Sequence, residues 1–305
     1  MIQDQIAELK TQLRGGVTPA MATPLNPGTH SVNTTAVGQL VDFLIGKSVS
    51  GLFIGGTTGE GTQLGPDQRL ALHEAAVAAA GKRVPVLIHV GAQRTETAVE
   101  LAAAAQATQP RPAAIVAMTP AFYGMHDDAL ARYYTAIAAA APDLPLFLYD
   151  IPQFAVNGIS SSLLGRLAGE LPSLAGMKSS RVDVQMVRQL IDAMPDGRIL
   201  LAGNESAALG MLALGADGLI SGLSTAIPEP FVALSRAYTA GDMAGAQRAQ
   251  RIVNRLLALL PAGARLGGIK AIIEQRGIPA GPPVPTLPGW EEPIWPQAEA
   301  ILSKL

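Results

Sequence analysis

The 305 residues are 49% hydrophobic and 15% charged, with no cysteine and a formal net charge of −2. A chain of this composition can bury a large core, which excludes intrinsic disorder, and it lacks the basic charge that nucleic-acid binding requires. A small molecule is therefore the expected partner. The absence of cysteine excludes disulfides, thiolate catalysis and cysteine-bound metals.

The N-terminal segment MIQDQIAELKTQLRGG carries charges throughout and lacks the apolar stretch of a secretory signal peptide. The mean hydropathy of the chain is positive, at +0.28. However, no stretch approaches about 18 uninterrupted apolar residues, because Gln, Arg, Asp and Pro interrupt the alanine-rich segments. We therefore expect a soluble, cytoplasmic protein that makes no membrane contact.

From about residue 16, short apolar runs alternate with longer segments of helical periodicity, which predicts parallel strands joined by helices. Eight such runs serve as strand candidates, namely VTPAM, GLFI, VPVLIHV, AAIVAM, LPLFLY, LAGMK, RILLA and GLIS, beginning at Val17, Gly51, Val84, Ala113, Leu144, Leu174, Arg198 and Gly218. Helices are expected between them, for example over Pro66–Ala80, Arg94–Ala107, Ser160–Leu171 and Asp183–Met194.

Eight alternating units also suit an open, doubly wound sheet, but no G-x-G-x-x-G motif follows the first strand. We therefore favour an α/β fold that is a closed (β/α)8 TIM barrel with additional C-terminal helices. Two or three further helices are expected between Pro228 and Arg276, and a last helix over Pro296–Leu305 follows the proline-rich stretch GIPAGPPVPTLP. Because no linker is visible, residues 1–305 are expected to form a single domain, with the barrel over about residues 16–240 and the helical extension over about residues 241–305.

The active site of such a barrel lies at the C-terminal ends of its strands, and Lys178 ends the sixth expected strand. The other five lysines fall in expected helices, loops or the tail: Lys10, Lys47, Lys82, Lys270 and Lys304. An amine among apolar layers is desolvated, which disfavours its ammonium form and suits a nucleophile. The alternative is a lysine that reaches solvent at the barrel mouth or pairs with a carboxylate.

Tyr149 ends the neighbouring strand, where its phenol can relay protons; a packed tyrosine with a satisfied hydroxyl is the alternative. The segment GGTTGEG follows the second strand and lacks the Gly-Lys-Ser/Thr of a nucleotide-binding loop. Its backbone N–H groups and the hydroxyls of Thr57 and Thr58 suit a carboxylate, although a plain tight turn also explains the glycines. Glu60 is expected to brace this turn.

The four histidines, His30, His73, His89 and His126, are scattered and have no ligand spacing, so we expect no metal. His89 ends the third strand, where we expect a core or supporting role. No G-x-S-x-G motif of a serine nucleophile is present.

Six motifs occur in a characteristic order: AMATP at Ala20–Pro24, GTTGE at Gly56–Glu60, YDIP at Tyr149–Pro152, GMK at Gly176–Lys178, GNES at Gly203–Ser206 and GADGLIS at Gly215–Ser221. On these motifs the chain resembles the dihydrodipicolinate synthase and N-acetylneuraminate lyase superfamily of class I, pyruvate-dependent lyases, over roughly residues 15–285.

The resemblance implies that pyruvate or another 2-oxo acid forms a Schiff base with Lys178 and that Tyr149 relays protons. It also implies that Thr57 and Thr58 hold the carboxylate and that Gly203 and Ile220 line the pyruvate pocket. No cofactor is then needed, because the protonated imine is itself the electron sink. Members of the superfamily are commonly tetramers built from dimers, so a homo-oligomer, dimer or tetramer, is expected.

Several positions depart from the superfamily pattern, and they bear on the substrate. Phe154 stands where dihydrodipicolinate synthases carry an arginine that binds the carboxylate of the aldehyde. Phe122 stands at the second tyrosine, which those synthases contribute across a dimer interface, and Tyr123 is one position away. Ser179 replaces the acidic residue that usually follows the lysine, and Val156 replaces a glycine, so the distal pocket is expected to be more apolar.

The leading hypothesis is an aldolase that interconverts pyruvate plus an aldehyde with a 2-keto-3-deoxy acid. A dehydratase acting on a similar acid through the same imine is the alternative within the class, and Phe154 disfavours a dihydrodipicolinate synthase. A barrel that binds 2-oxo acids without turnover is the alternative from another class, and the missing second tyrosine favours it.

Overall fold

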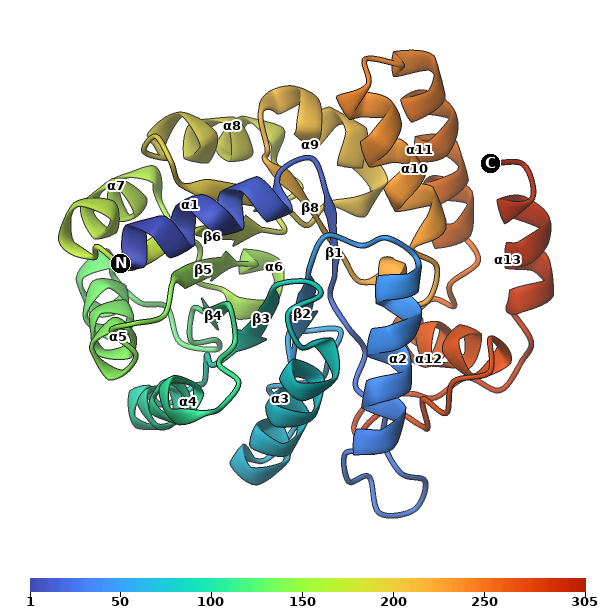
Figure 1. Cartoon of the computed structure of the whole chain (residues 1–305), viewed down its shortest axis with the longest axis horizontal. Coiled ribbons are helices and arrows are strands. Elements are labelled where there is room, and N and C mark those ends of the chain that lie inside the picture. The colour runs from blue at the N-terminus through green and yellow to red at the C-terminus, as the bar shows by residue number, and fades with distance from the viewer.

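The computed structural model describes all 305 residues and contains one sheet of eight parallel strands, curled into a barrel with helices around it (Figure 1). The strands are β1 Val17–Pro19, β2 Leu52–Ile54, β3 Val86–His89, β4 Ala114–Met118, β5 Leu146–Asp150, β6 Leu174–Ser179, β7 Ile199–Ala202 and β8 Gly218–Ser221. Their order is β1-β8-β7-β6-β5-β4-β3-β2, and a bridge between Ala20 and Phe53 nearly closes the ring between β1 and β2. The predicted (β/α)8 barrel is therefore confirmed.

All eight predicted strands are present, and their boundaries differ from the expected ones by a few residues. For example, β3 and β5 begin after Pro85 and Pro145, not at Val84 and Leu144. Proline has no N–H to donate to a neighbouring strand, so the regular ladder begins beyond it.

The helices that precede or connect the strands are α1 Ile2–Leu13, α2 Thr34–Gly46, α3 Pro66–Ala80, α4 Thr95–Ala107, α5 Asp127–Ala140, α6 Pro152–Ala155, α7 Ser161–Glu170, α8 Val184–Ala193 and α9 Ala208–Leu214. Helix α3 has the predicted bounds, whereas α7 and α8 begin one residue later than predicted. Ser160 and Asp183 lie just outside these helices, because their side-chain oxygens accept hydrogen bonds from the first turn as N-caps.

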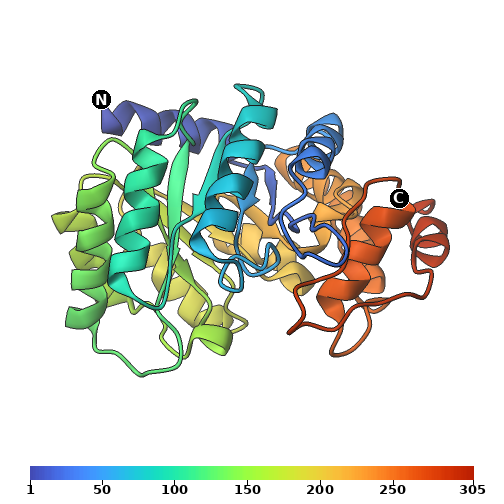
Figure 2. The same ribbon diagram turned by 90° about the horizontal axis from the view of Figure 1, so that it is seen from below.

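Helix α1 was not predicted, and it lies across one end of the barrel (Figures 1 and 2). Its residues Ile6, Leu9 and Leu13 are buried in one apolar cluster with side chains of the barrel interior, including Phe147. The amine of Lys10 donates a hydrogen bond of 2.7 Å to the carbonyl of Arg198, just before β7. Helix α1 therefore covers the N-terminal ends of the strands, opposite the end where Lys178 lies.

The C-terminal part of the chain forms four helices, α10 Glu229–Thr239, α11 Met243–Leu257, α12 Arg265–Gln275 and α13 Trp295–Leu302, which gather on one side of the barrel (Figure 2). This confirms the prediction of two or three helices before Arg276 and of one more near the C-terminus. The main core includes Ile269 and Ile272 of α12, so these helices pack onto the barrel. None of the helices is long and apolar enough to cross a membrane.

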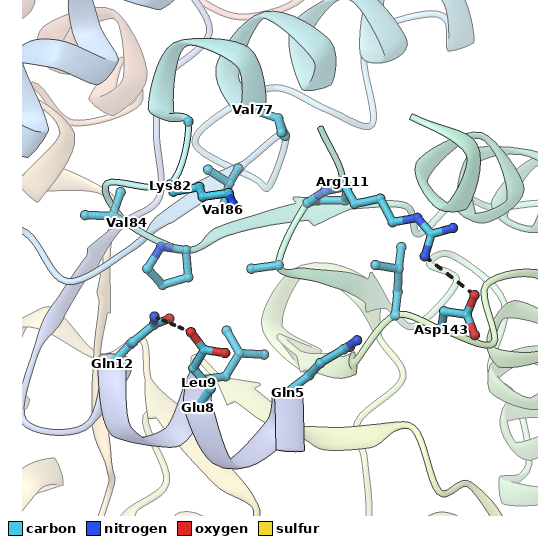
Figure 3. Close-up of a pocket in the computed structure, with 15 residues that line it drawn as sticks. Gln5, Glu8, Leu9, Gln12, Val77, Lys82, Val84, Val86, Arg111 and Asp143 are labelled. Carbon is cyan, nitrogen blue, oxygen red and sulfur yellow. Dashed lines mark hydrogen bonds and ion pairs between the residues drawn. The ribbon is translucent and has the colours of Figure 1, made fainter. Parts of the chain in front are cut away.

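A cavity of about 410 Å³ lies beside α1, at the N-terminal end of the barrel (Figure 3). Its lining is mixed: Leu9 and Val86 are apolar, and Arg111 pairs with Asp143 at 3.5 Å. None of the predicted site residues lines it. The site must therefore be sought at the opposite end of the strands, where barrel enzymes place their chemistry.

Candidate active site

A bulge in β6 determines where Lys178 points. The register between β5 and β6 shifts where Leu146 pairs with Leu174 but Phe147 pairs with Gly176, which leaves Ala175 as an extra residue. A side chain on Gly176 would lie 1.9 Å from the carbonyl oxygen of Ile199, so only glycine fits there. Ala175 lies in the apolar cluster inside the barrel, and Met177 lies in the main core outside it. Beyond the bulge, Lys178 is the register partner of Tyr149, whose side chain also lies inside the barrel.

The amine of Lys178 lies against two aromatic rings, with Nζ 4.1 Å from the ring centroid of Tyr149 and 4.8 Å from that of Phe53. The residue is only 5% exposed. No carboxylate pairs with it and no hydrogen bond engages it. The alternative in which Lys178 pairs with a carboxylate therefore does not apply, and the amine is free to bond to a carbonyl carbon.

The hydroxyl of Tyr149 lies 3.0 Å from Oγ1 of Thr57, within hydrogen-bond reach. Tyr149 is 1% exposed and its ring packs edge-on against Phe53 and His89. Thr57, by contrast, is exposed at the tip of its turn. The structure thus brings together three predicted site residues, Lys178, Tyr149 and Thr57, from β6, β5 and the turn after β2.

The GGTTGEG turn folds tightly back on itself, which explains its glycines. A Cβ on Gly61 would lie 1.7 Å from the carbonyl oxygen of Gly55, and a Cβ on Gly59 would lie 2.8 Å from that of Met21. Thr58 is half-buried and faces the end of β8, since its Oγ1 lies 2.7 Å from the position a Cβ on Gly222 would take. Glu60 is buried and braces the turn, as expected.

Gly203 and Ile220 border the same end of the barrel. Gly203 directly follows β7 and donates its N–H to the carbonyl of Ser179, at 2.7 Å. Ile220 is 2% exposed and belongs to the interior cluster that contains Tyr149. Both positions are compatible with the wall of a pocket above Lys178.

A buried ion pair that the sequence did not reveal flanks both Lys178 and Tyr149. Asp150 accepts from Nε of Arg181 at 2.6 Å and from Nη2 at 3.1 Å, and its carboxylate also accepts from Ser179 Oγ at 3.0 Å. A Cβ on Gly158 would lie 2.2 Å from Nη2 of Arg181, so this glycine makes room for the guanidinium. The pair joins the end of β5 to the segment after β6 and engages two nitrogens of Arg181.

His89 is held behind Tyr149 by a buried arginine. Nη2 of Arg69 donates to the carbonyl of His89 and lies 3.2 Å from Nδ1 of its ring, and no carboxylate pairs with this guanidinium. Burial lowers the pKa of Arg69 to about 10, and burial with the nearby Arg69 charge lowers the pKa of His89 well below 6.5. His89 is therefore neutral and supports the rings around Lys178, as expected of a supporting histidine.

Phe122 and Tyr123 lie outside this cluster in the loop after β4, and Phe154 lies outside it in the short helix α6 after β5. They are 78%, 75% and 69% exposed, respectively. Phe122 and Tyr123 pack edge-on against each other at 4.9 Å, and neither contacts Tyr149. Phe122 also has a left-handed backbone, with φ of 77°. No group of three His, Asp or Glu side chains has the arrangement of a metal site.

The functional neighbours that the sequence reasoning missed are Phe53 and the ion pair of Asp150 with Arg181. Phe53 is the central residue of an expected strand, and alternation along β2 would have indicated an interior side chain. Asp150 is the last residue of β5 and the register partner of Ser179, but its pairing with Arg181 depends on how the chain turns after β6, and no local pattern shows that.

Comparison with known proteins identifies the family of the chain. Residues 13–304 match the model of the Dihydrodipicolinate synthetase family. A probable 2-dehydro-3-deoxy-D-pentonate aldolase of Escherichia coli is 35% identical over 81% of this chain and 80% of its own length.

Two solved structures share the fold. A catalytic lysine mutant of the sialic acid aldolase of Ruminococcus gnavus superposes with a TM-score of 0.91 and 25% identity, over 96% of this chain and 97% of its own. A prophage protein of the dihydrodipicolinic acid synthase family from E. coli K12, in complex with pyruvate, has a TM-score of 0.86 and 27% identity, over 95% of this chain and 97% of its own. The chain therefore belongs to the dihydrodipicolinate synthetase family, a family of class I lyases and aldolases.

Proposed function

We propose that the protein is a Schiff-base aldolase that cleaves a 2-keto-3-deoxy acid into pyruvate and an aldehyde, or runs the reverse reaction. The observation that carries this proposal is the amine of Lys178, which is buried, free of any carboxylate and 4.1 Å from the ring of Tyr149. The related pentonate aldolase and the pyruvate-bound family member support the choice of substrate class.

In the proposed mechanism, Nζ of Lys178 attacks C2 of the 2-oxo acid and forms a carbinolamine, which loses water to give a protonated imine. The carboxylate lies on the GGTTGEG turn, near the hydroxyls of Thr57 and Thr58 and the backbone N–H groups. The Tyr149 hydroxyl gives and takes the protons of carbinolamine dehydration, and its 3.0 Å contact with Thr57 supports this role.

Carbon–carbon cleavage then breaks the bond between C3 and C4. Its electron pair moves into the imine to form an enamine, while the C4 hydroxyl loses its proton, through Tyr149, as the aldehyde forms. Protonation of the enamine at C3 and hydrolysis of the imine release pyruvate and restore the lysine. Dehydration of a similar acid would proceed from the same imine and is the alternative within the class.

The distal part of the pocket favours an aldehyde without a carboxylate. Phe154 offers no charge, and Arg181, the nearby cation after β6, is bonded to Asp150 through two nitrogens. A dihydrodipicolinate synthase needs a cation for the carboxylate of its aldehyde substrate, so this activity is disfavoured. Phe122 stands at the position of the second tyrosine of the synthases and is exposed. The lack of that tyrosine favours the rival function, a protein that binds 2-oxo acids without turnover.

Borohydride trapping tests the proposal. Pyruvate and borohydride are expected to leave a stable adduct on Lys178, located by peptide mapping, and Lys178→Ala should abolish both the adduct and turnover. Lys270 is the matched internal control, because it is also buried but is ion-paired with Glu60. An adduct found solely on another lysine would overturn the proposal, and an adduct on Lys178 without pyruvate release from any deoxy-sugar acid would favour the binder.

A further inference from the structure

A buried ion pair connects the GGTTGEG turn to the C-terminal helices. Nζ of Lys270, on α12, lies 2.7 Å from Oε1 of Glu60, and the two side chains are 2% and 0% exposed. The other carboxylate oxygen of Glu60 accepts the N–H of Val284 at 2.6 Å, and Lys270 also donates to the carbonyl of Pro282 at 2.8 Å. The turn is thus bonded both to α12 and to the segment after it.

Two features show that this pair does more than fill space. Glu60 has a left-handed backbone, with φ of 58°, a conformation that non-glycine residues keep only where their surroundings enforce it. In addition, a buried ion pair is often no more stabilising than an apolar pair of similar volume, so stability alone is a weak reason to keep it. A constraint on the conformation of the turn is the alternative reason for such a pair.

Backbone hydrogen bonds connect Glu60 to Thr57, whose side chain contacts Tyr149. The N–H of Glu60 donates to the carbonyl of Thr57 at 3.2 Å, and the N–H of Gly61 donates to that of Gly56 at 3.2 Å. Thr57 has one side-chain hydrogen bond, the 3.0 Å contact with the Tyr149 hydroxyl. Any displacement of the turn at Glu60 therefore moves the hydroxyl that orients Tyr149.

We propose that Lys270 is a positioning residue for the reaction, which acts through Glu60 to hold Thr57 against Tyr149 and to keep the carboxylate-binding turn in place. The inference rests on the proposed function for its kinetic consequence, but the placement of the turn is measurable without any substrate. The proposal also gives the C-terminal helices a role, because Lys270 on α12 contacts the turn at the catalytic end of the barrel.

The decisive variants are Lys270→Met and the double variant Glu60→Gln/Lys270→Met. The single variant leaves a carboxylate buried without its partner, and a loss of stability is expected. The double variant leaves no buried charge, so its melting temperature should lie closer to that of the wild type. The control is Arg276→Met: this arginine follows α12, its side chain is 9% exposed, and it bonds Glu229 and the carbonyl of Ala226 rather than any residue of the turn.

Hydrogen exchange, measured without substrate, tests the placement of the turn. In Lys270→Met and in the double variant, the amides of residues 56–63 should exchange faster than in the wild type, whereas Arg276→Met should leave them unchanged. In kinetics, the double variant should show a rise in the KM for the 2-oxo acid and a fall in kcat/KM of about tenfold to 100-fold, a loss typical of a displaced catalytic group.

Wild-type exchange of the turn and wild-type kinetics in the double variant would overturn the inference, since Lys270 would then matter for stability alone. If Lys270→Met does not fold, the double variant and Glu60→Gln, which keeps an acceptor for Val284, carry the test. Failure of the wild type itself to form an imine would overturn the proposed function, while the exchange of residues 56–63 would still decide the role of Lys270.

Discussion

At the scale of single residues, Tyr149 and Lys178 are side by side because they are register partners in adjacent parallel strands. Tyr149→Phe keeps the ring that packs against Phe53 and His89 and removes only the hydroxyl that contacts Thr57. We therefore expect turnover to fall about 100-fold or more, because a proton relay is lost, with little change in melting temperature. Steady-state kinetics and thermal unfolding check this, and an unchanged rate would place the relay on another group, such as Tyr123 or water.

Phe154 is the residue at which aldehyde preference should be switchable. A charge-assisted bidentate contact is worth a few kcal/mol, and each 1.4 kcal/mol is about tenfold in specificity. The wild type should therefore prefer glyceraldehyde or glycolaldehyde to aspartate semialdehyde by about 100-fold or more in kcat/KM.

Phe154→Arg should raise the relative rate with the semialdehyde, and Phe154→Leu serves as the uncharged control. A wild type that prefers the semialdehyde would contradict this assignment, because Arg181 is already bonded to Asp150.

At the scale of elements, α3 and β3 carry a pH dependence of stability. Burial, with a smaller contribution from the Arg69 charge, lowers the pKa of His73 from 6.5 to about 3, and His89 on β3 is lowered in the same direction. Both histidines are thus neutral in the folded state, whereas the unfolded chain protonates them below about pH 6.5. The folded state is then favoured above this pH and loses stability as the pH falls.

The expected loss is up to about 1.4 kcal/mol per pH unit for each histidine below pH 6.5, and for His73 it continues until about pH 3. Urea unfolding at pH 7.5, 6.5 and 5.5 measures it before most carboxylates titrate. His73→Phe should reduce the slope of unfolding free energy against pH by about half, since one of the two histidines remains. An identical slope in the variant would show that His73 is not the titrating group.

At the scale of the whole molecule, the loop after β4 exposes two aromatic side chains, and a second copy of the chain is the expected partner that covers them. Phe122 and Tyr123 are exposed together, and the left-handed backbone of Phe122 is the kind of strain that an interface can hold in place. We expect a dimer or a tetramer in light scattering at micromolar concentration. The double variant Phe122→Asp/Tyr123→Asp should shift the equilibrium between oligomer and monomer toward the monomer. A monomeric wild type would contradict the expectation.

The predicted division of the chain, with a barrel over about residues 16–240 and an extension beyond it, and the predicted cytoplasmic location stay predictions. The Lys270–Glu60 pair nevertheless shows that α12 contacts the turn after β2 directly. A test of the isolated barrel would therefore remove a contact of the candidate site as well as the added helices.

The sequence by itself determined the number, order and type of the strands, because each apolar run is short and is bounded by prolines, glycines or charges. It also placed Lys178 and Tyr149 at the ends of neighbouring strands, because strand ends follow from the same pattern. Only the tertiary structure decided that Lys178 points inward, since the bulge at Ala175 reverses the alternation of side chains along β6. The contacts of Asp150 with Arg181 and of Glu60 with Lys270 were decided there too, because segments distant in sequence must first pack before their charges can meet.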